Sequence, residues 1–166
     1  MPEVITRTAS AYISAGNVST TSHPFLTIGA ANLIHSLGNE KQKEDFLPPM
    51  QDGRYAGTMA LTEPGQGSAL ADIKTRAVPS EDGSYRLFGQ KVFITCGDHS
   101  LTENIVHLVL AKIEGAPIGV KGISLFVCPK FLLENDGSIG RRNDVVLTGL
   151  FHKMGYRNFF SGSLYA

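Results

Sequence analysis

Residues 59–77 read MALTEPGQGSALADIKTRA, and the fold is interpreted outward from this stretch. It opens with apolar residues typical of a strand and then turns polar around Gly65 and Gly67. A turn of this kind can direct consecutive backbone N–H groups at an anion, with the hydroxyls of Thr62 and Ser68 as further donors. It can equally be a plain turn at the end of a strand, because glycine-rich turns are common there.

The two best-known nucleotide-binding loops do not fit this turn. A P-loop requires GxxxxGK[ST], which GQGSALADIK lacks, and the fingerprint G-x-G-x-x-G needs a glycine where Leu70 stands. The residues that follow also indicate strand rather than a long helix. An anion-binding turn that follows an apolar strand, Met59 to Leu61, would suit a flavin, because the strand offers a flat wall to an aromatic ring and the turn offers N–H groups to a pyrophosphate.

Upstream of the turn, the sequence predicts three helices. Apolar residues recur at helical spacing over 4–13 and again over 25–37. Asn39 is expected to cap a third helix, NEKQKEDFLPPM. We expect that helix to close at Pro48 and Pro49, because proline lacks the N–H that a helix needs.

Downstream of Asp52 the pattern changes to short strands joined by turns, with Asp82-Gly83 as a hairpin signal. The segment 134–144 is polar and is expected to be an exposed loop. Strands are predicted at 55–61, 76–78, 85–88, 91–95, 105–113, 123–128, 145–150 and 162–165. The predicted fold class is therefore α+β, with short N-terminal helices followed by an antiparallel β-barrel or sandwich.

The composition excludes several classes of function. Of the 166 residues 42% are hydrophobic, and 15 basic residues balance 15 acidic ones, so no basic face is expected for nucleic acid. No apolar run is long enough to span a membrane, and no secretory signal opens the sequence. Cys96, Cys128 and the five histidines show no metal-ligand spacing. We therefore expect no metal site, a cytoplasmic protein with reduced thiols, and a structural role for His107 in mid-strand.

Several motifs together carry a resemblance to one family. The stretch 59–77, followed by DGSYRLFGQKVFITCG at 82–97, resembles the middle domain of acyl-CoA dehydrogenases, with its TEP-x-x-GSD, I-x-T-x-A and G-x-K-x-[WF]-I-[TS] patterns. The segment 37–57 is similar to the family's lead-in, G-x-x-x-Q-K-x-x-x-L-P. Further matches are NIVHLVLAK, GAPIGVKGISLFVCPK and RNDVVLTGLFHKMGYR, the last most similar to the subgroup that includes methylmercaptopropionyl-CoA dehydrogenase.

The resemblance implies FAD as cofactor and the α,β-dehydrogenation of an acyl-CoA thioester, with hydride transfer to flavin N5. It implies that residues 1–52 are the terminal helices of an incomplete N-terminal helical domain. Residues 53–166 would be the β-barrel middle domain that binds FAD and acyl-CoA. The C-terminal helical domain, which carries the catalytic glutamate, is expected to be absent. No catalytic residue is assigned here, since Glu63 belongs to the flavin-loop motif.

The resemblance also implies a role for individual residues. The strand before the turn would run beside the isoalloxazine ring, and Thr62 would hydrogen-bond the flavin. Ser68 would approach both the pyrophosphate and the acyl-CoA, and Thr95 would lie near the reactive edge of the ring. The implied cofactor-binding residues are Met59, Ala60, Leu61, Thr62, Gly67, Ser68, Phe93, Ile94 and Thr95.

Two positions depart from the family pattern. Ala69 stands where the family has the aspartate of GSD, and Phe151 stands where an acidic residue precedes HKMG. The sequence also stops beside a predicted strand, which indicates a truncated or split protein. We expect a fragment inactive alone, able to pair with a separate chain carrying the C-terminal helices, and a homo-oligomer. The alternative is a non-catalytic β-domain remnant that acts as an oligomeric binding or interaction module.

Overall fold

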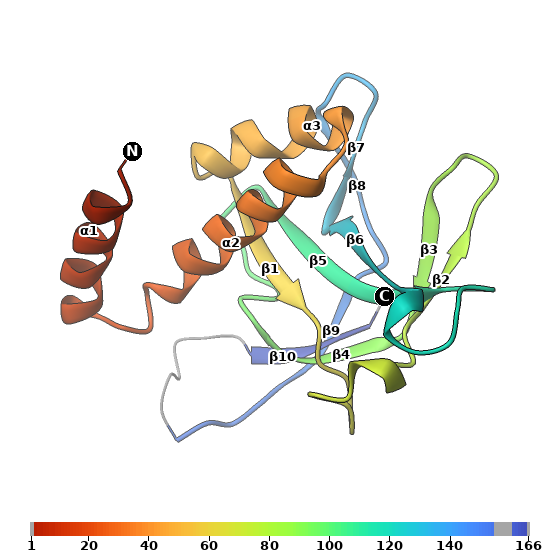
Figure 1. Ribbon diagram of the computed structural model, residues 1–166. Helices are drawn as coiled ribbons and strands as arrows, with labels where there is room; N and C mark the ends of the chain where they lie inside the picture. The colour runs from red at the N-terminus through yellow and green to blue at the C-terminus, as the bar shows by residue number, and fades with distance from the viewer. Residues whose placement is uncertain (1, 155–160, 166) are drawn as a thin grey trace.

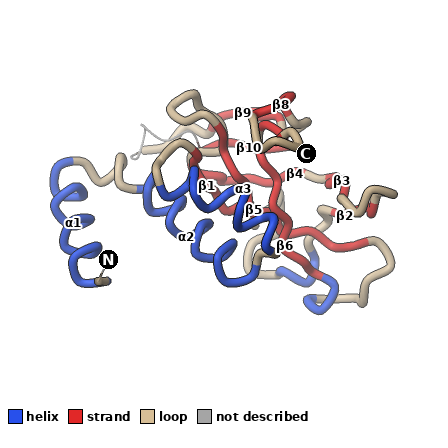
Figure 2. Tube along the Cα trace, turned by 90° about the horizontal axis from the view of Figure 1, so that it is seen from above, coloured by secondary structure: helices blue, strands red, loops and turns tan. Residues whose placement is uncertain are grey.

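The structure is a computed structural model that describes residues 2–154 and 161–165 (Figure 1). In this part of the chain three α-helices come first: α1 (Glu3–Gly16), α2 (Ser22–Leu37) and α3 (Glu40–Gln51). Helix α1 stands apart from the rest in both views and buries none of its residues (Figures 1 and 2). Helices α2 and α3 lie against the strands and form one of the two core clusters with them.

Asn39 caps helix α3, as predicted, and the cap is a full capping box. The Asn39 side chain accepts the Gln42 N–H at 2.8 Å, and the Gln42 side chain accepts the Asn39 N–H at 3.0 Å. The prediction that the helix closes at Pro48 is wrong, because it continues to Gln51. A proline removes a donor but keeps its carbonyl, and the carbonyl of Pro48 accepts the Asp52 N–H at 3.1 Å. Burial of this last turn against the strands offsets the lost donors.

Each of the eight predicted strands is found, and two further strands, at 131–133 and 139–142, were not predicted. The strands are β1 (Tyr55–Ala60), β2 (Arg76–Pro79), β3 (Tyr85–Phe88), β4 (Gln90–Thr95), β5 (Asn104–Ile113), β6 (Ile123–Pro129), β7 (Phe131–Leu133), β8 (Ile139–Arg142), β9 (Val146–Leu150) and β10 (Ser161–Tyr165). Strand β5, the longest of these, pairs with β1, β2 and β6. The order in the largest sheet is β1-β5-β2-β3, with β6 paired to β5, and β4-β10-β9 and β7-β8 form separate sheets.

The α+β class is confirmed, and the sheet differs from the prediction in strand direction. Strands β1 and β2 each pair with β5 in parallel, whereas the other pairs are antiparallel, so the sheet is mixed. A parallel pair needs a long connection, and more than forty residues separate β1 from β5. The alternation of apolar and polar residues indicates which face of a strand is buried, but not whether the strand runs parallel to its neighbour. The sequence therefore could not predict the parallel pairs.

The segment 134–144 is not wholly a loop, because it contains β8, which forms a hairpin with β7 just before the segment. Asp136 accepts the Ser138 N–H at 2.9 Å, and Gly137 has a left-handed φ of 80°. The predicted hairpin at 82–84 uses the same Asp-Gly-Ser turn, with the Ser N–H on the Asp side chain at 2.9 Å. The signal that identified one hairpin was therefore present in the other.

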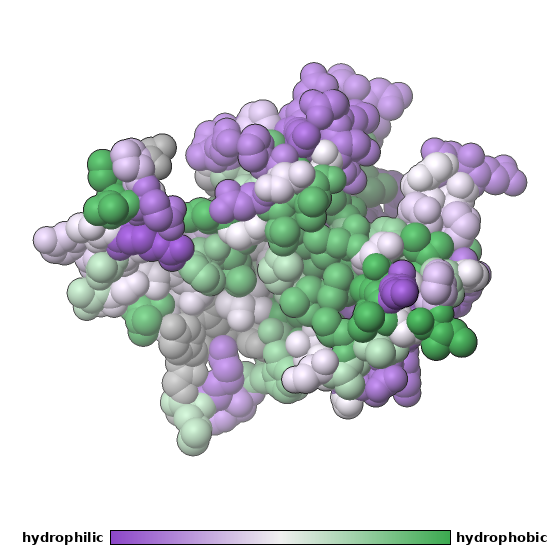
Figure 3. Space-filling view, in the orientation of Figure 1, coloured by the Kyte–Doolittle hydropathy of each residue, from purple (hydrophilic) through white to green (hydrophobic). Residues whose placement is uncertain are grey.

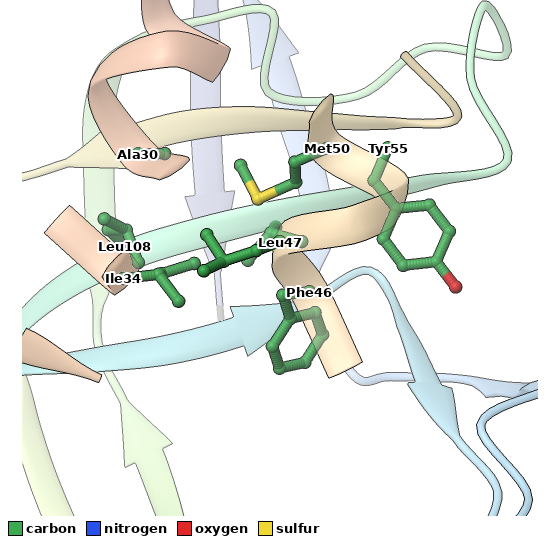
Figure 4. Close-up of a cluster of buried hydrophobic side chains, with 8 residues drawn as sticks. Ala30, Ile34, Phe46, Leu47, Met50, Tyr55 and Leu108 are labelled. Atoms are coloured by element: carbon green, nitrogen blue, oxygen red, sulfur yellow. The ribbon is translucent and has the colours of Figure 1, made fainter. Parts of the chain in front are cut away.

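Within the described residues the core divides into two clusters. The first lies between α2, α3 and the sheet (Figure 4), and the second lies inside the curled sheet. Gly57 on β1 allows the close approach of α2, because a Cβ there would lie 2.7 Å from the Ala30 Cβ. The first cluster holds Ala30, Ile34, Phe46, Leu47, Met50, Tyr55, Val106 and Leu108, and the second holds Ala60, Ile94, Val109, Cys128 and Val145.

His107 is a buried structural histidine, as expected. It is 1% exposed, and its Nδ1 lies 2.7 Å from the hydroxyl of Thr58, which is fully buried on the neighbouring strand β1. Burial lowers the pKa of His107 to about 4, so the ring is neutral at pH 7.

Candidate functional site

The glycine-rich turn is anchored by the buried carboxylate of Glu63, which is 4% exposed. This carboxylate accepts hydrogen bonds from the Lys91 ammonium at 2.8 Å, the Thr75 hydroxyl at 2.5 Å and the Lys74 N–H at 2.6 Å. Burial alone would raise the pKa of Glu63, but these hydrogen bonds outweigh it and hold the pKa below its usual value. Glu63 is therefore an ionised anchor for the turn.

The turn itself is closed by its own backbone and opens outward beyond it. The N–H groups of Glu63 and Gln66 each donate to the other residue's carbonyl, at 2.9 and 3.0 Å, and Gly65 has a φ of 78°. A Cβ added at Gly67 would meet no atom within 4 Å. Within the described part of the chain, the N–H groups of Gly67 and Ser68 donate to no other residue. The turn thus presents two donors to open space, as an anion-binding turn requires.

The end of β1 and the strand β4 lie side by side, so the predicted wall residues come together. The Val92 N–H donates to the Thr62 carbonyl at 2.8 Å, and the Lys91 ammonium donates to the Leu61 carbonyl at 3.2 Å. Met59, Leu61 and Thr62 are half-buried. The turn and both predicted walls therefore share one region.

Phe93 is the unusual residue of β4. Its φ is 59°, in the left-handed region that bulky residues avoid, and its side chain is 64% exposed. Its ring lies 5.0 Å from the ring of Phe151, and the half-buried Thr95 follows two positions later. A backbone held in this sparsely populated conformation to expose an aromatic ring is typical of functional sites.

The side chains of two predicted cofactor-binding residues face the core. Ala60 and Ile94 are 1% and 2% exposed, and both side chains pack in the second core cluster. Contact of either residue with a ligand would therefore involve the backbone rather than the side chain.

The turn after β4 is fixed by an ion cluster that the sequence did not reveal. The carboxylate of Asp98 lies 2.6 Å from the Lys130 ammonium and 3.1 Å from the Arg142 guanidinium. Lys130 also donates to the carbonyl of His99 at 2.7 Å. Asp98 and Arg142 are 44 positions apart, so no spacing rule joins them.

Both cysteines are buried and are not activated as nucleophiles. Burial raises the pKa of the Cys96 thiol to about 12 and that of Cys128 to about 11, so neither is a thiolate nucleophile at pH 7. Among the described residues, no cluster of three metal-ligating side chains forms. No helix in this part of the chain is both long and apolar enough to span a bilayer.

A sequence model described as the acyl-CoA dehydrogenase middle domain matches residues 58–166. The chain belongs to the acyl-CoA dehydrogenase family. This confirms the family that the motifs at 59–77 and 82–97 indicated.

Relatives within the acyl-CoA dehydrogenase family agree with this assignment. The chain is 43% identical to 3-methylmercaptopropionyl-CoA dehydrogenase of Ruegeria pomeroyi over 95% of its own length and 27% of that protein's length. It is 49% identical to a butyryl-CoA dehydrogenase of Syntrophomonas wolfei over 78% of the chain and 22% of that protein. The chain thus spans about a quarter of the length of these relatives.

Solved structures of acyl-CoA dehydrogenases share the fold. An acyl-CoA dehydrogenase from Bacillus anthracis, solved in complex with FAD, superposes with a TM-score of 0.65 at 30% identity, over 89% of this chain and 23% of that one. An acyl-CoA dehydrogenase from Geobacillus kaustophilus gives a TM-score of 0.64 at 34% identity, over 81% of this chain and 32% of that one.

Proposed function

We propose that this chain supplies the flavin-binding face of an FAD-dependent acyl-CoA dehydrogenase, which oxidises the α,β bond of an acyl-CoA thioester. The observation that carries the proposal is Phe93 on β4, whose ring is exposed at a cost in backbone strain. The open Gly67–Ser68 turn follows Thr62, whose carbonyl accepts the N–H of Val92 on the same strand β4. An exposed aromatic ring together with N–H donors at an open turn suits a flavin dinucleotide.

The groups present fit FAD part by part. The Phe93 ring and the half-buried Leu61 offer apolar surface to the isoalloxazine ring. The N–H groups of Gly67 and Ser68 suit the pyrophosphate, and the hydroxyls of Thr62 and Thr95 suit the polar ring edge. Bound FAD would supply a hydride acceptor at N5, since such redox chemistry belongs to the cofactor.

The chain's own contribution is to bind and orient. The Glu63–Lys91 ion pair holds the turn against β4, so the pyrophosphate donors and the ring wall keep a fixed distance. Ser68 would also meet the acyl-CoA. The base that removes the α proton would come from a carboxylate outside these 166 residues, on the same polypeptide or on a partner chain. We therefore expect no dehydrogenase activity from this chain alone.

The alternative, an oligomeric interaction module without catalysis, has one observation in its favour. Large apolar side chains are exposed on α1 and α2, among them Tyr12 at 79% and Phe25 at 66%. Figure 3 shows apolar side chains gathered at the centre of one face, below the polar surface of α3. We propose that such surfaces meet other domains or a second copy. Light scattering at 100 µM tests the homo-oligomer, since a monomer at that concentration contradicts it.

FAD titration, followed by quenching of flavin fluorescence, tests the flavin-binding face. Phe93→Ala should weaken FAD binding about tenfold, because stacking of an aromatic ring contributes about 1–1.5 kcal/mol. The matched control is Phe25→Ala on α2, a similarly exposed phenylalanine at 66%, which should leave FAD affinity unchanged. Equal affinities of the two variants would overturn the assignment of Phe93, and absence of quenching in the unsubstituted chain would overturn the proposal.

We also propose a cytoplasmic location, which the reduced state of Cys96 and Cys128 favours. Fractionation of the expressing cell would test it, since recovery in any other compartment contradicts it.

A further inference from the structure

A hollow of about 370 Å³ lies between α2, the connection from α3 to β1 and the turn 99–102. None of the predicted FAD-binding residues lines it, so it is distinct from the flavin face. At about 30 Å³ per water-sized group, it has room for roughly a dozen non-hydrogen atoms. That is the small end of the range for small-molecule sites.

His99 supplies the polar group of this hollow. It is 9% exposed, and its Nδ1 accepts the Leu101 N–H at 3.3 Å. Because Nδ1 is the acceptor, the proton of the neutral ring lies on Nε2. Among the described residues, Nε2 of His99 is the buried side-chain nitrogen or oxygen atom without a hydrogen-bond partner. Native proteins rarely leave such a donor unused, so each case calls for a partner.

The position of His99 is fixed by its neighbours. Its carbonyl accepts the Lys130 ammonium at 2.7 Å, and its ring meets the ring of His23 edge-on at 5.5 Å between centroids. Nε2 is covered by its neighbours, so a ligand reaches it only after one of the covering side chains moves. The hollow itself is preformed, whereas access to Nε2 is not.

The lining determines which ligand fits. No Asp, Glu, Lys or Arg side chain is among the described residues that line the hollow, so a charged ligand would lack a counter-charge. Burial lowers the pKa of His99, with smaller contributions from His23 and Lys130 in the same direction and from Asp98 in the other. Burial also lowers the pKa of His23. Both rings are thus neutral at pH 7.

Apolar walls complete the lining, namely Pro24, Ile28, Met50 and Leu101. We propose that this hollow binds a small, neutral, mostly apolar molecule whose carbonyl oxygen accepts a hydrogen bond from Nε2 of His99. The inference goes beyond the proposed flavin function and does not depend on it.

The first test compares two probes of the same shape on the unsubstituted 166-residue chain without FAD. Cyclohexanone carries the carbonyl acceptor, and methylenecyclohexane replaces the oxygen by a carbon. Two-dimensional amide NMR should show saturable shifts at Leu101 and Thr102 with cyclohexanone, and at least fivefold weaker binding of methylenecyclohexane. Equal affinities, or no shifts at these amides with cyclohexanone at its solubility limit, would overturn the proposal.

The second test uses His99→Phe, which keeps an aromatic ring and removes the donor. It should weaken cyclohexanone about tenfold and leave methylenecyclohexane unchanged. His35→Phe on the exposed side of α2 is the matched control and should alter neither probe. A His99→Phe variant that binds cyclohexanone as tightly as the control contradicts the role of Nε2. If that variant does not fold, the comparison of the two probes on the unsubstituted chain decides alone.

Discussion

Glu63→Gln should destabilise the chain strongly, because it breaks a buried ion pair from one side. The side chains of Glu63 and Lys91 are each 4% exposed, so neutralising the carboxylate leaves the Lys91 ammonium buried without its counter-charge. Removing one partner of such a pair costs about 3–5 kcal/mol, a large part of the total of about 5–15 kcal/mol that stabilises a typical domain.

The assay is urea unfolding followed by far-ultraviolet circular dichroism. The matched control is Glu114→Gln, which breaks the exposed pair with Arg76 at 2.6 Å and should cost at most about 1 kcal/mol. The double variant Glu63→Gln with Lys91→Met should recover part of the loss, because no unpaired charge then remains buried.

The pH dependence gives an independent check. The pKa of Glu63 is lower in the folded chain than in the unfolded one, so the ion pair's stabilisation is present above the unfolded pKa. It is lost as the pH falls through the folded pKa, and the difference between the parent and Glu63→Gln should shrink below about pH 4. If Glu63→Gln costs no more than Glu114→Gln at pH 7, the reasoning about a buried anchor is wrong.

Three further predictions address the core and the turn after β4. Gly57→Ala should lower stability by about 1–3 kcal/mol in thermal unfolding, because its Cβ would lie 2.7 Å from that of Ala30; an unchanged midpoint would contradict the close approach. The pKa of His107, about 4 when folded, lies below its unfolded value, so its contribution to stability should fall as the pH drops from about 6.5 towards 4; a folded pKa near 6.5 by NMR would refute its burial. Asp98→Asn should weaken the ion pair with Lys130 and cost about 1–3 kcal/mol in urea unfolding, whereas no loss would show that the cluster does not hold the turn.

Much of the local structure follows from the sequence because it is encoded locally. The helix cap at Asn39 and the hairpin at Asp82-Gly83 depend on neighbours in sequence, and both are found as predicted. The hairpin of β7 and β8 was missed although its Asp-Gly-Ser turn repeats the first, because β8 is mostly polar and the segment 134–144 was interpreted as one exposed loop. Helix α3 passes Pro48 because tertiary burial overrides a local breaker.

The features that needed the structure depend on contacts between distant residues. Parallel pairing of β1 with β5, and the cluster that joins Asp98 to Arg142, connect segments that no periodicity relates. The cofactor-binding residues were predicted from the types and order of residues in the motifs, and their role stays a prediction. Only the fold shows that Phe93 is exposed while Ile94 faces the core.

The most direct test of the flavin-binding proposal is the visible absorption spectrum of the purified chain after FAD has been added and the free cofactor removed by desalting. If Phe93 and the Gly67–Ser68 turn hold FAD, a flavin absorption band should remain with the protein. The band should be weaker in Phe93→Ala than in the unsubstituted chain and equally strong in Phe25→Ala. A colourless protein after desalting, combined with no FAD binding at high micromolar concentration, would contradict the proposal that this chain supplies the flavin-binding face.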